Sequence, residues 1–336
     1  MSVKVAINGF GRIGRLVFRA WLERQKTPFN IVAINDLGDA PSLVHLLRYD
    51  SVHGAVADEL SLSGDTLTTS RGSVRFLQQG VASDLPWRDW GIDIVLECSG
   101  RFTSRDKASA HLAAGARAVL VSAPCTDADL TVVYGINHDT VTKDHQVVSN
   151  ASCTTNCLVP VVHLLDQHFG FERGYMTTIH SYTGDQSPVD TWHKDLRRAR
   201  AAALSMIPTT SGAARAVKLV LPHLDGKLDG CAVRVPTANV SLVDLTFTAE
   251  KSLTCEAMND VMSQAAQSSL RGVLAYNDLP LVSVDFNHHA ASSIFDATQT
   301  QVVDGRLGRV VAWYDNEWGF SNRMLDSAGV LAGVVT

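Results

Sequence analysis

A cysteine and a histidine are the residues of this sequence best suited to covalent chemistry. Cys153 lies among small hydroxyl and amide residues directly before the apolar run 158–165, so Ser152 is expected to cap a helix that begins at Cys153. Helix-start N–H groups and the helix dipole favour anions, which lowers the pKa of a thiol and makes it nucleophilic. His180 ends a predicted strand and is suited to accept the thiol proton and later return it. The spacing alone leaves open a packed cysteine and a buried structural histidine.

A glycine-rich turn near the N-terminus is the second candidate site. A strand pattern at 3–8 leads into G-x-G-x-x-G, apolar residues recur at helical spacing over 16–21, and a second strand pattern at 31–34 ends beside Asp36. In a dinucleotide-binding unit such glycines allow a tight turn, close approach of the backbone to a pyrophosphate, and close helix–strand packing. An acid at Asp36 accepts hydrogen bonds from an adenosine ribose and repels a 2′-phosphate, which favours NAD over NADP. The plain alternative is a turn without a ligand. The turn glycines are Gly9, Gly11 and Gly14.

The elements that follow place both sites at the carboxyl ends of strands. Apolar strand patterns at 92–97, 118–122 and 146–149 alternate with helical segments, which predicts a doubly wound α/β sheet. We therefore predict a Rossmann-type NAD-binding domain over 1–152, completed by a C-terminal helix at 317–336. Three local expectations accompany it: antiparallel hairpins between 59 and 77, a polar turn between Trp87 and Trp90, and a strand at 132–137.

The rest of the chain predicts an α+β catalytic and phosphate-binding domain over 153–316. Its strand patterns indicate a mixed, largely antiparallel sheet. Pro160 is expected to bend the helix that follows Cys153 or to cause a local loss of hydrogen bonding there. Arg234 alternates with two valines and is expected to point into a cleft. The predicted strands are 174–180, 230–235, 241–248, 292–303 and 309–314, with a helix at 256–270 between them.

Two polar stretches of this domain are suited to anions. A basic cluster at 194–200 is either a solvated face or a loop that binds phosphate or another subunit. Hydroxyl residues at 208–212 are expected to open a helix over 213–220, and helix starts favour anions.

The composition narrows the class of protein. The 336 residues have 46% hydrophobic and 19% charged content and a net charge of −5, with no long run of like charge. Neither nucleic acid nor a membrane is therefore an expected partner. Six cysteines in a chain of this length do not form a disulfide scaffold, and their spacing predicts no metal site. A reduced, cytoplasmic setting is expected.

The chain resembles phosphorylating glyceraldehyde-3-phosphate dehydrogenases nearly from end to end. The cysteine stretch is specific to that family and its near relatives. The matching stretches are INGFGRIGR at 7–15, ASCTTNC at 151–157, HKDLRRAR at 193–200 and WYDNEWG at 313–319.

This resemblance implies a reaction, its cofactor and a set of contact residues. The Cys153 thiolate would attack glyceraldehyde 3-phosphate to give a thiohemiacetal, hydride transfer to NAD would leave a thioester, and inorganic phosphate would release 1,3-bisphosphoglycerate. His180 would act as the general base and as the imidazolium partner of the thiolate. The implied cofactor contacts are Gly9, Gly11, Arg12, Ile13, Gly14, Asp36, Ser122 and Asn316, and the implied substrate and phosphate contacts are Ser152, Thr154, Thr183, Arg198, Ser211, Gly212 and Arg234.

The resemblance also implies a cytoplasmic homotetramer in glycolysis or gluconeogenesis. Thr191-Trp192 replaces the Leu-Pro that is common in NAD-specific members, which leaves NADP use open, and Ser211 keeps the hydroxyl of the more usual threonine. The alternatives are erythrose-4-phosphate dehydrogenase and a non-catalytic, NAD-sensing binding protein.

Overall fold

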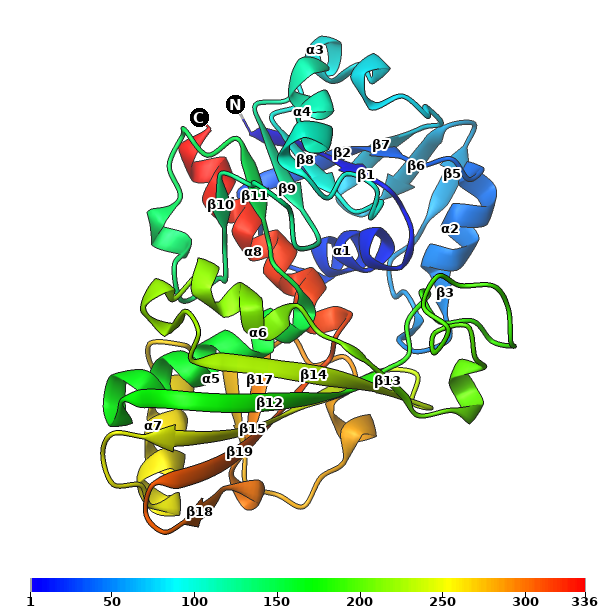
Figure 1. The fold of residues 1–336 in the computed structure, drawn as a ribbon. Helices are drawn as coiled ribbons and strands as arrows, with labels where there is room; N and C mark the ends of the chain where they lie inside the picture. The colour runs from blue at the N-terminus through cyan, green and yellow to red at the C-terminus, as the bar shows by residue number, and fades with distance from the viewer. Residues whose placement is uncertain (1, 336) are drawn as a thin grey trace. The chain divides into compact units, whose positions relative to one another are not determined.

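The computed structural model describes residues 2–335, which form two compact units. The first comprises residues up to Ser152 together with a C-terminal segment from Ser321, and the second comprises Cys153–Phe320. No helix within the described residues is both long and apolar enough to cross a bilayer. Figure 1 shows the course of the chain through both units.

The first unit is built on a nine-stranded sheet with a parallel core. The strand order is β10-β11-β9-β8-β1-β2-β7-β6-β5, and all pairs from β11 to β7 are parallel. Counted along the chain, the six core strands follow the order 3-2-1-4-5-6 of a dinucleotide-binding sheet, whose topological switch point lies between β1 and β8. The strands are β1 Val3–Asn8, β2 Phe29–Asn35, β5 Ser61–Ser63, β6 Thr66–Thr69, β7 Gly72–Leu77, β8 Ile94–Glu97, β9 Ala118–Val121, β10 Leu130–Thr131 and β11 Val147–Ser149.

Helices cover both faces of this sheet. Ala6, Ala33 and Val95 face the side of α3 and α4 and pack with the fully buried Trp87, while α1 lies on the opposite side (Figure 1). The helices of the unit are α1 Arg12–Glu23, α2 Ala40–Arg48, α3 Trp87–Trp90, α4 Arg105–Ala113 and most of α8 Trp318–Val334, and a small hairpin joins β3 Tyr49–Asp50 to β4 Gly54–Ala55.

Two local expectations for the first unit are wrong, and one is confirmed. Trp87–Trp90 is a short helix rather than a turn, ended by Gly91 in the left-handed conformation. Residues 132–137 form a turn after β10, because the Asn137 side chain accepts from Val133 N and donates to Thr131 O, each within 2.9 Å. The antiparallel hairpins predicted between 59 and 77 are present as β5, β6 and β7.

The second unit has a mixed sheet, largely antiparallel as predicted. Its order is β13-β14-β12-β15-β19-β17-β16, with β18 beside β19, and only the pairs β12–β14 and β16–β17 are parallel. The strands are β12 Phe171–Ser181, β13 Ile207–Thr210, β14 Leu228–Val235, β15 Ser241–Ala249, β16 Leu274–Asn277, β17 Ser293–Asp296, β18 Gln301–Val303 and β19 Leu307–Tyr314. The helices are α5 Cys153–Phe169, α6 Ala213–Ala216 and α7 Cys255–Gln267.

Two boundaries in this unit differ from the sequence-based expectation. Helix α5 continues through Pro160, which has no N–H to donate within the helix. The segment expected to open a helix at 208–212 contributes to β13 as far as Thr210. The helix predicted over 213–220 is present as the short α6, continued by a 3-10 turn at Val217–Leu219. The strand predicted at 292–303 is divided by a helical turn at Ala297–Gln299, because the Asp296 side chain accepts from the N–H and hydroxyl of Thr298.

Candidate active site and nucleotide-binding turn

Cys153 is the first residue of α5, as the sequence predicts, and its thiol faces a histidine. The Sγ atom lies 3.6 Å from Nε2 of His180, the next-to-last residue of β12. Upstream, Ala151 adopts φ 57°, a left-handed conformation that costs energy for a residue with a side chain. The chain therefore makes a strained turn immediately before the thiol.

The ionisation of this thiol differs from the expectation. Burial raises the pKa of Cys153, and the nearby Arg234 charge and the hydrogen bonds at the helix start lower it less than burial raises it. Burial and the Arg234 charge also lower the pKa of His180 to about 3. The pair at rest is thus a neutral thiol and a neutral imidazole rather than a thiolate and an imidazolium.

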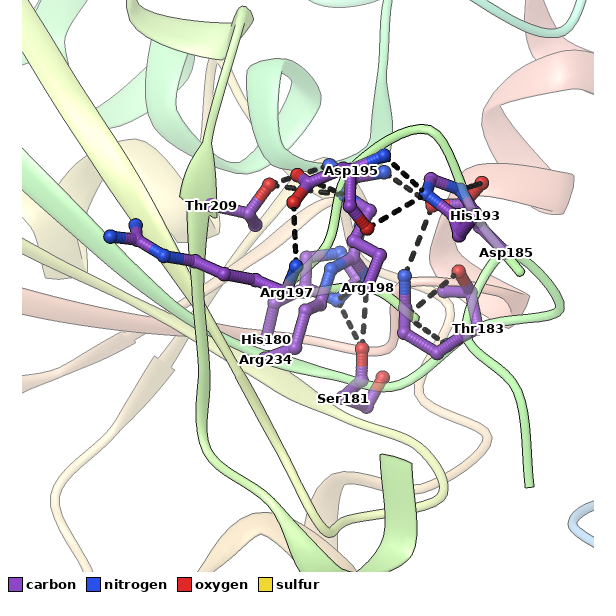
Figure 2. A network of polar contacts seen from close by, with 11 residues as sticks. His180, Ser181, Thr183, Asp185, His193, Asp195, Arg197, Arg198, Thr209 and Arg234 are labelled. Atoms are coloured by element: carbon purple, nitrogen blue, oxygen red, sulfur yellow. Dashed lines mark hydrogen bonds and ion pairs between the residues drawn. The ribbon is translucent and has the colours of Figure 1, made fainter. Parts of the chain in front are cut away.

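Arg234 lies beside His180 because β12 and β14 are parallel neighbours in register. His180 pairs directly with Arg234 across the two strands. The Nη1 atom of Arg234 is 2.7 Å from Nδ1 of His180 and donates to the carbonyl oxygen of Ser181 at 2.9 Å (Figure 2). Burial lowers the pKa of Arg234, and the Cys153 thiol opposes that shift. The predicted cysteine, histidine and arginine therefore form one group.

The Nδ1 atom of His180 has two competing partners. It lies 2.7 Å from the carbonyl oxygen of Ser181, which only accepts, and 2.7 Å from an Arg234 nitrogen, which only donates. With Nδ1 protonated, the ring donates to Ser181 and leaves Nε2 free to accept from the thiol. With Nδ1 unprotonated, Nε2 carries the hydrogen toward sulfur. The tautomer therefore decides which way a proton can move between sulfur and the ring.

Arg198 belongs to a second polar group in the loop after β12. Its guanidinium pairs with Asp185 and donates to the Thr209 hydroxyl at 2.8 and 3.1 Å. Thr183 lies in the same loop, where its N–H donates to Gln186 at 2.9 Å. Figure 2 shows this group alongside His180 and Ser181. The loop thus holds Arg198 in place by contacts at both ends of its guanidinium.

The sequence-based reasoning missed two residues that organise the site. Tyr314 on β19 is buried, and its hydroxyl bonds Thr154 and Thr178 at 2.9 Å each, which ties the first turn of α5 to β12. Thr209 anchors Arg198. The sequence contained a sign of each residue, because Tyr314 lies within the WYDNEWG stretch and Thr209 within the hydroxyl-rich stretch at 208–212.

The remaining predicted residues of this unit have local partners. Ser211 accepts from Ala213 N at 3.2 Å, and Gly212 precedes α6. Asn316 is buried and its Oδ1 accepts from the hydroxyls of Ser181 at 2.8 Å and Ser241 at 2.9 Å, which fixes the orientation of the amide. Cys157 is fully buried beside Ser293, and burial raises the pKa of its thiol to about 12.

At two positions of the glycine turn in the first unit, any side chain would clash with the protein's own backbone. Gly9 has φ +90°, and a Cβ there would lie 2.4 Å from Ser99 N, while a Cβ at Gly14 would lie 2.1 Å from the Gly9 carbonyl oxygen. A Cβ at Gly11 would meet nothing within 4 Å. Gly11 therefore keeps open a space that the chain does not fill, which fits the close approach of a dinucleotide to this turn.

A pocket of about 330 Å³ adjoins this turn. Asp36 lines it with a fixed carboxylate, which accepts from Phe10 N at 2.6 Å and from Gly38 N at 2.8 Å. Leu37 and Phe102 supply apolar surface. Four other predicted contacts of this unit lie outside the pocket lining. Arg12 pairs with Asp50, and Ile13 and Gly14 follow it in α1. Ser122 follows β9, and its N–H donates to Glu97 O at 2.9 Å.

Potential metal ligands and cysteine thiols occur throughout the described residues. Across residues 2–335 no three His, Cys, Asp or Glu side chains meet in an arrangement that would hold a metal ion. All six cysteines are free thiols.

The dinucleotide-binding sheet and the separate cysteine–histidine domain place this chain in the class of NAD-dependent dehydrogenases. The NAD-binding-domain profile of glyceraldehyde 3-phosphate dehydrogenase matches residues 3–105, and the C-terminal-domain profile matches residues 152–316. The chain belongs to the glyceraldehyde-3-phosphate dehydrogenase family.

Similar proteins of that name come from several bacteria. The glyceraldehyde-3-phosphate dehydrogenase of Xanthobacter flavus is 58% identical over 328 residues, which cover 98% of each chain. The chromosomal enzyme of Cupriavidus necator is 57% identical over 334 residues and that of Pseudomonas aeruginosa 55% over 333, each covering 99% of both chains.

Proposed function

We propose that this protein catalyses the oxidative phosphorylation of D-glyceraldehyde 3-phosphate to 1,3-bisphosphoglycerate with reduction of NAD, a reaction of glycolysis and gluconeogenesis. The observation that carries the proposal is the 3.6 Å approach of Cys153 Sγ to His180 Nε2, with Arg234 on the other side of the ring. A nucleophile next to a base, with a cation nearby, suits acyl transfer through a covalent intermediate.

In this proposal one domain of the chain binds the cofactor and the other carries out catalysis. Residues 1–152 with the helix at 317–336 hold NAD, and 153–316 carry catalysis. The space left at Gly11, the uncapped start of α1 and the fixed Asp36 carboxylate support NAD binding at the turn. When bound, NAD supplies the acceptor for the hydride that leaves the thiohemiacetal carbon. The proposed cofactor contacts are Gly9, Gly11, Arg12, Ile13, Gly14, Asp36, Ser122 and Asn316.

Proton movement in the proposed reaction runs between Cys153 and His180. As sulfur attacks the aldehyde carbon, the thiol proton passes to Nε2, provided that Nδ1 donates to the carbonyl oxygen of Ser181, 2.7 Å away. The backbone N–H of Cys153 and the new imidazolium N–H stabilise the oxyanion. Phosphate then attacks the thioester carbon, the C–S bond breaks, and the thiol is regenerated.

Two anions are bound in the proposal, one on the substrate and one that attacks. Thr183, Arg198 and Arg234 bind the substrate phosphate, and the anchored guanidinium of Arg198 supports that role because a fixed fork loses little entropy on binding. The proposed contacts for inorganic phosphate are Ser152, Thr154, Ser211 and Gly212.

We also propose that the protein is a cytoplasmic homotetramer. Several large apolar side chains between 189 and 206 are exposed, among them Trp192 at 88% and Leu204 at 86%, which is unusual for a monomer and suits a subunit contact. Light scattering coupled to gel filtration tests the tetramer.

Steady-state kinetics of the wild type and Cys153→Ser test the proposed activity. NADH formation should require phosphate, and Cys153→Ser should lose it while still binding NAD. Cys231→Ser, which changes another partly exposed thiol, is the matched control and should stay active. Substantial turnover by Cys153→Ser would refute the thioester route, and faster oxidation of erythrose 4-phosphate would refute the substrate. A comparison of NAD with NADP in the same assay measures cofactor preference.

A further inference from the structure

Glu97 is a buried carboxylate that the proposed mechanism does not use. It ends β8, beside the switch point of the first sheet, and is 1% exposed. Its two oxygens accept from Asn8 Nδ2 at 2.6 Å, from the backbone N and the hydroxyl of Ser99 at 2.7 and 2.5 Å, and from His111 Nε2 at 3.0 Å. A buried charge is retained only where such donors surround it. Neither Lys nor Arg is among these four donors.

The state of His111 follows from its second neighbour. The Trp87 indole N–H donates to Nδ1 of His111 at 3.2 Å, and both side chains are fully buried. An indole nitrogen only donates, so Nδ1 carries no hydrogen. The hydrogen of the neutral ring is therefore on Nε2, where it donates to Glu97. Trp87 thus sets the tautomer of His111, and His111 orients the carboxylate.

From Glu97 the hydrogen bonds continue across the sheet to the pocket beside the glycine turn. Asn35 Nδ2 donates to Asn8 Oδ1 at 2.8 Å, and Gln79 N donates to Asn35 Oδ1 at 2.9 Å. All three of these residues, and Ser99, line the pocket. The buried pair of Trp87 and His111 is therefore linked, through one carboxylate, to polar groups that line the pocket.

Ser99 connects the same carboxylate to the glycine turn. Its backbone nitrogen, which donates to Glu97, lies 2.4 Å from where a Cβ of Gly9 would be. The turn and the segment after β8 are thus in close contact, and the Glu97 carboxylate bonds the backbone nitrogen at that contact. Atoms packed this closely have little room to move, because protein interiors are close-packed and transmit strain.

We propose that His111 is a positioning residue for cofactor binding: through Glu97 it holds Ser99 and Asn8 in the arrangement that the nucleotide half of NAD requires. The inference rests on the proposed function, in which this pocket and turn bind NAD. His111 does not itself line the pocket. Besides its bond to Glu97, its ring packs against Phe102, which does line the pocket, with ring centroids 5.3 Å apart. His111→Phe keeps an aromatic ring for this contact, so the loss expected in that variant reports on the carboxylate.

The test compares two substitutions at one position in the full-length enzyme. His111→Phe keeps the ring but removes the donor to Glu97, whereas His111→Gln restores an N–H donor of similar reach. The dissociation constant of NAD, measured by titration calorimetry, should rise about tenfold in His111→Phe and remain within about threefold in His111→Gln, since a hydrogen bond to a charged group is lost only in the first. With saturating NAD, kcat should be nearly unchanged.

Controls separate positioning from general damage. His138→Phe removes another histidine of the same unit that does not line the pocket, and NAD affinity should not change. Alkylation of Cys153 by iodoacetamide without NAD should proceed at the wild-type rate in both His111 variants. Trp87→Phe removes the N–H that fixes the tautomer of His111 but leaves His111 itself in place. This variant should also bind NAD more weakly without a change in kcat. It provides the test of the inference if His111→Phe does not fold.

Unchanged NAD affinity in His111→Phe or in Trp87→Phe would overturn the inference. So would equal losses in His111→Phe and His111→Gln, because a structural role does not distinguish them. Wild-type protein that binds no NAD would instead refute the proposed function, and the inference with it.

Discussion

The ring of His180 separates Cys153 from Arg234: its Nε2 atom lies 3.6 Å from the thiol sulfur, and its Nδ1 atom lies 2.7 Å from the guanidinium. The arginine charge therefore acts on both partners of the proposed proton transfer. It lowers the pKa of Cys153, which favours the thiolate, and it lowers the pKa of His180, which disfavours the imidazolium. The first effect activates the nucleophile, while the second keeps the base neutral and able to accept a proton.

Substitution of Arg234 is expected to make the thiol less reactive at neutral pH. Without the guanidinium, burial raises the pKa of Cys153 with less opposition, so the thiolate fraction falls. The rate of iodoacetamide alkylation measured against pH should shift to higher pH in Arg234→Gln. The alkylation rate of Cys153→Ser measures the background reaction of the other five thiols and is subtracted. A profile identical to that of the wild type would show that Arg234 does not tune the nucleophile.

His180 should make the second unit less stable in acid. Its pKa is lowered from 6.5 to about 3 in the folded protein, so unfolding takes up a proton between these values. The free energy of unfolding therefore rises with pH through this window, and His180 contributes about 2 kcal/mol to the difference between pH 5.0 and 6.5.

Urea unfolding at these two pH values measures the effect. His180→Asn should reduce the pH dependence by about that amount, whereas His145→Asn, at a partly exposed histidine of the first unit, should not. Equal pH dependence in the wild type and His180→Asn would mean that the folded protein does not hold His180 neutral.

The parts of the site that depend on neighbouring residues in the chain were predictable from the sequence. Cys153 begins a helix because small capping residues precede an apolar run, and Gly9 occupies its turn because the motif directly follows a strand. Both inferences need only local spacing.

The parts that depend on sheet register were not predictable. His180 meets Arg234 because β12 and β14 are parallel neighbours, and 54 residues separate the two side chains in the chain. Thr209 and Tyr314 lie in stretches that the sequence singles out, but their partners in the site come from strands that pair across the sheet. The direction of the pKa shift of Cys153 was missed for the same reason, since burial is a property of the folded unit.

Arg198 should control the affinity for the sugar phosphate. Its guanidinium is held by Asp185 and Thr209, and a fixed cation that binds phosphate in both ground and transition states affects KM more than kcat. Arg198→Leu is expected to raise the KM for glyceraldehyde 3-phosphate about tenfold or more. Arg197→Leu is the matched control, because no contact of its guanidinium joins it to this group. The prediction fails if both variants change KM equally.

Gly11 and Gly14 should respond differently to the same added methyl group. A Cβ at Gly14 would lie 2.1 Å from a backbone oxygen. Gly14→Ala is therefore expected to lower the free energy of unfolding by about 3 kcal/mol, at the upper end of what overpacking costs. A Cβ at Gly11 meets no protein atom within 4 Å, so Gly11→Ala should unfold like the wild type but bind NAD more weakly. The reason is that its methyl group occupies the space proposed for the pyrophosphate.

Urea unfolding and NAD titration on both variants distinguish these effects. Gly100→Ala does not serve as a control because Gly100 has a positive φ, whereas Gly212→Ala adds a methyl group in open space of the second unit and should leave NAD affinity unchanged. Normal NAD affinity in a stable Gly11→Ala protein would place the dinucleotide elsewhere than at the start of α1.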